Sequence, residues 1–197
     1  MERNKLSRRH FIQMSAFGVG SLLLFPQCSP QLRKSSWRFF SVEEAFLMDT
    51  IVEQIIPTDE WMGARDAGVT NFIDKQLVGP YVRFQEKYRN GLSAIQSSCH
   101  ILFRKPFEEL SWDEQTGFLK MMETGKLSQT LESRDPSQKG EKIWENNFDR
   151  SFFNLVCDHT MQGFYGSPRH GGNKDYVSYR MIGLDYPFTI GQNRYKS

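Results

Sequence analysis

The chain has 197 residues, and four of its 25 Lys and Arg residues with one of its 23 acids fall within residues 1–27. The remaining 170 or so residues carry a formal charge of −1, which argues against a nucleic-acid binder and a polybasic membrane-surface protein, because both need clustered cations. The hydrophobic fraction of 39% is too high for a disordered chain and suits one ordinary domain.

Residues 1–30 have the three parts of an export signal, namely a basic start, a short apolar run at residues 14–25 and a polar boundary. The segment before the apolar run is similar to the twin-arginine motif S-R-R-x-F-L-K, with matches at Ser7, Arg8, Arg9 and Phe11. A general secretory signal that contains an Arg pair is the alternative. The weak apolar run favours the twin-arginine route, which carries folded proteins and is read by a receptor.

Cys28 follows the apolar run and is a candidate lipidation site. Pro26 and Gln27 depart from the small residues that a bacterial lipobox prefers, so lipidation and ordinary signal cleavage both stay open. Cys99 and Cys157 lie in apolar helical patterns, where a free thiol behaves as a small hydrophobic group. We therefore expect these two cysteines to be unpaired.

A linker with an aromatic end is expected at residues 31–40, before a single helical domain at residues 41–197. Ser41 and Glu44 have capping-box spacing, and the helix they open should end at Pro57. Residues 61–68 are rich in turn formers. Apolar residues then recur at helical spacing in a short helix, with Val69, Phe72, Ile73 and Leu77 on one face.

The second half of the domain continues the helical pattern. A long helix is expected over residues 81–103, and a second capping box at Ser111 and Glu114 should open a helix over residues 112–124. The polar residues 126–140 predict a mobile loop, and residues 141–162 predict another helix. Because no strand-like alternation appears, the fold class is mostly α, a compact bundle of about five helices.

The tail from Gly163 onward changes character. Six of the 15 glycines fall in the last 35 residues, where they alternate with aromatic residues. Glycines allow tight turns and close backbone approach, and aromatic side chains supply contact area. Such an irregular segment cannot build its own core, so it packs on its own helices or against a partner. The sequence leaves both options open.

Motifs for catalysis are scarce. No G-x-G-x-x-G follows a strand, no G-x-S-x-G marks a nucleophile elbow, and no cysteine pair has metal-ligand spacing. His159 lies in an apolar helical face, where a hydrogen-bonded core histidine is the commoner outcome. His170, beside Arg169 and near Asn173 in a Gly-rich loop, is the best candidate for a functional histidine.

Two segments together resemble the gluconate 2-dehydrogenase subunit 3 family, the small subunits of membrane-associated flavin dehydrogenases. Residues 51–74 are similar to the pattern I-I-P-x-D-x-x-x-G-A-x-x-A-G-V-x-x-F-I-D, and residues 163–183 to G-F-Y-x-x-P-x-Y-G-G-N-x-x-x-x-x-W-x-x-I-G. His170 stands where Tyr is usual and Tyr179 where Trp is usual. Matching positions in the second segment include Gly163, Phe164, Tyr165, Pro168, Gly171, Gly172, Asn173, Ile182 and Gly183.

The resemblance implies a non-catalytic subunit with no cofactor of its own. Its expected partners are a large FAD-dependent subunit of the glucose–methanol–choline type, sometimes a cytochrome c subunit, and the twin-arginine translocase. The complex would oxidise a sugar or sugar acid in the periplasm and stay membrane-associated through its other subunits or a lipid anchor. The tail then becomes the expected docking surface, formed by Phe164, Tyr165, Pro168, His170, Gly171, Gly172, Asn173, Tyr176 and Tyr179.

Two other functions compete with this interpretation. One is a small exported enzyme with a polar site at Arg169, His170 and Asn173, and the other is a free-standing exported lipoprotein. The substrate of the complex stays open, because the pocket would lie in the other subunit.

Overall fold

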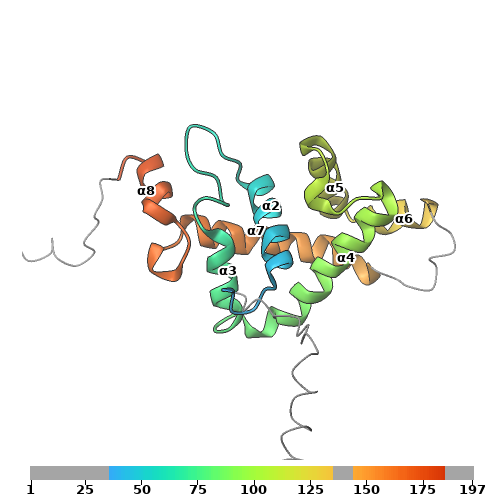
Figure 1. Cartoon of the computed structure of the whole chain (residues 1–197), viewed down its shortest axis with the longest axis horizontal. Coiled ribbons are helices and arrows are strands. Elements are labelled where there is room, and N and C mark those ends of the chain that lie inside the picture. Colours follow the sequence, from blue (N-terminus) through green and yellow to red (C-terminus); the bar gives the residue numbers. More distant parts are fainter. Residues whose placement is uncertain (1–35, 135–143, 185–197) are drawn as a thin grey trace, which may run out of the picture. The chain divides into compact units, whose positions relative to one another are not determined.

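The computed structural model describes residues 36–134 and 144–184, and all regular structure in these two ranges is helical (Figure 1). The mostly α fold class is therefore confirmed. The described residues form seven α-helices, two more than the expected five: α2 (Val42–Ile55), α3 (Val69–Leu77), α4 (Gln85–Phe103), α5 (Trp112–Thr124), α6 (Leu127–Arg134), α7 (Phe148–Tyr165) and α8 (Val177–Met181).

Both predicted capping boxes are present. In α2 the backbone N–H of Glu44 donates to Ser41 Oγ at 3.1 Å, and the N–H of Ser41 donates to the Glu44 carboxylate at 2.8 Å. The same pair of bonds opens α5 at Ser111 and Glu114. Each box satisfies backbone donors of the first turn that have no partner within the helix, which fixes where these helices begin.

Two of the expected helices begin later in the structure than the sequence predicts. The helix expected from residue 81 begins as a 3₁₀ turn, Val82–Phe84, and becomes α-helical only at Gln85. The helix expected over residues 141–162 instead starts at Phe148, after a 3₁₀ turn at Glu145–Asn147, and runs to Tyr165. The left-handed backbone of Asn147, with φ of 56°, separates this turn from α7.

The expectation of a loop over residues 126–140 is wrong for its first half. Residues 127–134 form α6, because Leu127 and Leu131 lie four positions apart and are both buried. Helix α6 packs against α4 and α5, so tertiary contacts stabilise a short and otherwise polar helix. The rest of the expected loop lies outside the described residues.

Helix α7 is the centre of the domain. It contacts α2, α3, α4, α5 and α8. In Figure 1, α3 and α8 lie toward its C-terminal end, and α5 lies toward its N-terminal end. Phe152, Val156 and Phe164 bury one face of α7 in the core. None of the helices in the described ranges is long and apolar enough to cross a membrane.

Candidate functional site

The loop that follows α7 is built around one buried amide side chain. The Nδ2 of Asn173 donates to the carbonyl of Gly166 at 2.8 Å, and its Oδ1 accepts from the backbone N–H of Ser178 at 3.0 Å. Asn173 is fully buried and has a left-handed backbone, with φ of 47°. It therefore fixes the path of the chain between the end of α7 and the start of α8.

Two glycines of the tail allow close packing. A Cβ at Gly172 would overlap the carbonyl oxygen of Gly163, and a Cβ at Gly163 would lie 2.8 Å from the ring of Phe72. Side chains at these positions would push the tail away from α7, or α7 away from α3. Gly163 and Gly172 of the second resemblance segment thus serve packing within this chain.

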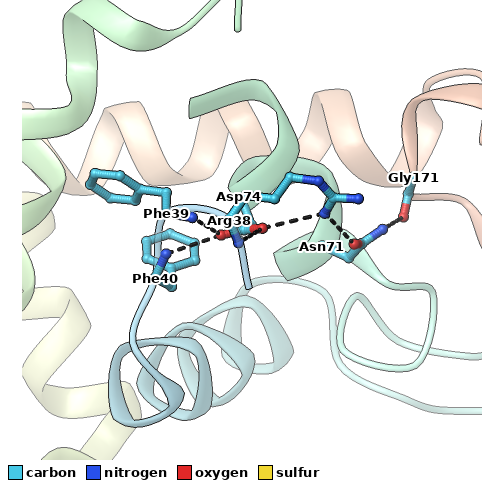
Figure 2. A network of polar contacts seen from close by, with 6 residues as sticks. All are labelled: Arg38, Phe39, Phe40, Asn71, Asp74 and Gly171. Atoms are coloured by element: carbon cyan, nitrogen blue, oxygen red, sulfur yellow. Dashed lines mark hydrogen bonds and ion pairs between the residues drawn. The ribbon is translucent and has the colours of Figure 1, made fainter. Parts of the chain in front are cut away.

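Hydrogen bonds from helix α3 and the residues just before it also hold the loop that follows α7. The Nδ2 of Asn71 donates to the carbonyl of Gly171 at 2.8 Å, as Figure 2 shows, and the N–H of Lys174 donates to the carbonyl of Ala67 at 3.0 Å. Lys75 Nζ also reaches the carbonyl of Arg169, at 3.3 Å. The two segments that carry the family resemblance, about a hundred positions apart, are therefore joined in space.

The structure separates the predicted docking residues into inward and outward groups. Phe164, Gly172 and Asn173 are buried within this chain and are not available to a partner at the surface. Phe164 was expected as a docking anchor, and it is instead a core residue of α7 with no exposed surface. Pro168, Gly171, Tyr176 and Tyr179 are partly exposed, and Tyr165 and His170 are exposed.

Tyr165 is the most informative of the outward residues. It is 50% exposed and makes an edge contact with Phe164, their ring centroids 5.0 Å apart, which restricts its position at the end of α7. The rings of Tyr176 and Tyr179 lie 6.0 Å apart at the start of α8. The exposed ring of Tyr165 thus rests against the buried ring of Phe164.

An apolar group that was not predicted from the sequence lies at the end of α8. Met181, Ile182 and Leu184 are all exposed, and Ile182 is exposed by 70%. The only sequence signal for this group is that Ile182 matches the family pattern. Helical periodicity does not show that its side chain faces outward.

The polar residues of the competing enzyme site do not come together as one accessible group. Arg169 and His170 are exposed on the 3₁₀ turn Pro168–His170, whereas Asn173 is enclosed and both polar atoms of its amide are bonded within the loop. Asn173 is therefore not available to a ligand beside His170.

His159 and the two domain cysteines are structural groups. His159 is buried, and Nδ1 lies 2.9 Å from the hydroxyl of Tyr88; burial lowers the pKa of the imidazole to about 4. Cys99 and Cys157 are free, as predicted. Burial raises the pKa of both thiols, that of Cys157 to about 11, so both stay protonated and weakly nucleophilic at neutral pH.

No group of three His, Cys, Asp or Glu residues in ranges 36–134 and 144–184 is arranged to hold a metal ion. The predicted export residues Ser7, Arg8, Arg9 and Phe11 and the candidate lipidation site Cys28 lie outside the described residues.

A family model described as gluconate 2-dehydrogenase subunit 3 matches residues 42–185, which include all seven described α-helices and the tail loop. No curated protein and no solved structure matches the chain.

Proposed function

The chain belongs to the gluconate 2-dehydrogenase subunit 3 family, a family of accessory dehydrogenase subunits, and we propose that it docks on and exports a large flavin-dependent subunit. The complex would oxidise a sugar or sugar acid in the periplasm, with FAD on the large subunit and catalysis there. A cytochrome c subunit would accept the electrons in complexes that contain one. This chain would contribute the export signal and a surface that stabilises the large subunit.

The observation that carries the docking proposal is the contrast in exposure among apolar positions of the family pattern. Val69, Phe72, Ile73 and Phe164 are buried in the domain, whereas Tyr165 and Ile182 are exposed by 50% and 70%. Leaving large apolar side chains in water costs free energy that a protein–protein interface recovers. A bound partner would bury these two side chains, which packing within this chain leaves exposed.

The rigidity of the tail supports the same proposal. The bonds of Asn173, the Asn71 bond to Gly171 and the close approach of Gly172 to Gly163 hold the loop between α7 and α8 before a partner arrives. A surface that is ordered in advance loses less conformational entropy on binding. The tail is therefore suited to bind with only a few exposed anchors.

The export part of the proposal comes from the twin-arginine-like leader. The sequence contains no dinucleotide-binding fingerprint and no C-x-x-C-H, so this chain gives no reason of its own for a route that carries folded, cofactor-loaded proteins. A bound flavoprotein without a leader supplies that reason. A lipid at Cys28, or the other subunits, would keep the complex at the membrane.

The docking surface is tested with Tyr165→Ser and Ile182→Ser in this chain, each co-expressed with the tagged flavoprotein subunit. We expect each substitution to weaken binding at least about tenfold, as for central apolar anchors of interfaces. Phe46→Ser is the matched control, because Phe46 is 60% exposed but lies on α2. Unchanged affinity in both tail variants, with helical content intact, would refute the docking surface.

A further inference from the structure

Residues 36–40, hereafter the strap, are held by one buried carboxylate. The backbone N–H groups of Arg38, Phe39 and Phe40 donate to the two carboxylate oxygens of Asp74 at 2.8, 2.8 and 3.0 Å. Figure 2 shows the three amides converging on Asp74, which projects from α3 and is itself fully buried. Three charge-assisted bonds to consecutive amides fix the backbone of the strap on α3.

Arg89 of α4 holds the strap from outside. Its guanidinium lies over the ring of Phe39, 4.1 Å from the centroid, donates to the carbonyl of Phe39 and pairs with Glu44 of α2. The ring of Phe40 is 2% exposed and packs edge-on against Tyr88, with centroids 5.9 Å apart. The strap is thus tied to helices α3 and α4, although it was expected to be part of a linker and precedes the family match at residue 42.

We infer that Asp74 sets the boundary between the export leader and the folded domain, and that proteolytic removal of the leader is confined to peptide bonds before residue 36. This inference rests on the proposed export function for the leader itself. A peptidase binds its substrate as an accessible, extended backbone. In the strap the amides are occupied by Asp74 and the Phe40 side chain is in the core, so cleavage there requires local unfolding.

The inference also assigns the strap to the mature protein. A chain cut after Phe40 would lose all three amide donors to Asp74 and leave a buried carboxyl without those partners. It would also lose the contact between Phe40 and Tyr88. The mature protein therefore needs the strap to keep Asp74 of α3 hydrogen-bonded and the ring of Tyr88 in α4 covered by Phe40.

The chain provides an internal test, because trypsin sites lie on both sides of the proposed boundary. Arg33 and Lys34 precede the strap and Arg38 lies within it. In the folded full-length chain, purified with its leader, we expect cleavage after Arg33 or Lys34 to be at least tenfold faster than after Arg38. Equal rates at the two places would overturn the inference without any variant.

Asp74→Asn tests the role of the carboxylate while keeping its shape. An amide NH₂ in place of one oxygen faces a backbone N–H, so we expect cleavage after Arg38 to accelerate about tenfold, with unchanged cleavage after Arg33 and Lys34. The control is Asp175→Asn, an exposed acid whose left-handed backbone, with φ of 54°, asparagine accepts well. A variant that keeps its helical content and still protects Arg38 would overturn the inference.

The N-terminus of the exported protein, measured by intact mass, separates this inference from the proposed function. A first residue at or before Ser36 supports the boundary, and any first residue after Ser36 overturns it while leaving the export signal intact. The trypsin experiment needs neither export nor a partner, so failure of the proposed function would leave that result valid.

Discussion

The hydroxyl of Tyr88 lies 2.9 Å from Nδ1 of His159, and both side chains are buried between α4 and α7. The imidazole also stacks on the ring of Tyr81, with centroids 4.2 Å apart. Burial raises the pKa of Tyr88 well above its ordinary value and lowers that of His159 to about 4. The pair is therefore neutral at physiological pH, and one hydrogen bond joins the Tyr88 hydroxyl to Nδ1.

His159 makes the stability of the domain depend on pH. The unfolded chain binds a proton on His159 near pH 6.5, whereas the folded chain resists protonation until about pH 4. The free energy of unfolding therefore has its full value above pH 6.5, where His159 is neutral in both states. It decreases as the pH falls from 6.5 toward 4, because only the unfolded chain takes up the proton. We expect a loss of about 3 kcal/mol over this window, from 1.36 kcal/mol per pKa unit.

Urea unfolding at several pH values between 7 and 4 measures this loss. His159→Gln removes the titrating group, so the difference in unfolding free energy between wild type and variant should shrink as the pH falls. A difference that stays constant over the window would contradict the assignment.

Gly91 and Gly117 form a matched pair for core packing. A Cβ at Gly91 in α4 would overlap the ring of Phe152, whereas a Cβ at Gly117 in α5 would meet nothing within 4 Å. Gly91→Ala should destabilise by about 1–3 kcal/mol despite its better helix propensity. Gly117→Ala should stabilise by about 0.5–1 kcal/mol.

Thermal unfolding of the two variants checks this prediction, because the shifts have opposite signs. Stabilisation by Gly91→Ala would show that α4 and α7 are not packed as closely as described.

Asn173→Ala tests whether the amide of Asn173 holds the loop between α7 and α8 in place. The change removes both amide bonds and places alanine in a left-handed backbone, so we expect a cost of about 2–4 kcal/mol. Asn173→Gly keeps the backbone conformation and should cost less. Hydrogen exchange reports the site directly, because the N–H of Ser178 loses its acceptor in both variants and should exchange faster.

Lys174→Ala is the neighbouring control, since Lys174 is exposed and contributes its backbone N–H rather than its side chain. Unchanged exchange at Ser178 in both Asn173 variants would show that the loop between α7 and α8 does not depend on this amide.

Local signals in the sequence were enough for the parts of the fold that depend on near neighbours. The capping boxes at Ser41 and Ser111, the turn-rich residues 61–68 and the bounds of α5, residues 112–124, depend on neighbours within a few residues, and the structure confirms them. Helix α6 was missed because only Leu127 and Leu131 anchor it, and their burial depends on distant helices.

The candidate site was harder to predict because it depends on which way adjacent residues face. Phe164 and Tyr165 are neighbours of similar chemistry, yet one is in the core and the other is half exposed. Asp74 matches the end of a family pattern, but its partners are amides 34 to 36 residues upstream. Neither composition nor helical periodicity contains this information.

The carrier role is tested most directly by the location of the flavoprotein subunit when it is co-expressed with this chain. With the wild-type leader, we predict that flavin-dependent dehydrogenase activity reaches the periplasm. With Arg8→Lys and Arg9→Lys together it should stay in the cytoplasm, whereas the control Arg3→Lys, a basic residue outside the motif, should leave export unchanged. A flavoprotein that reaches the periplasm equally well with the doubly substituted leader would contradict the account.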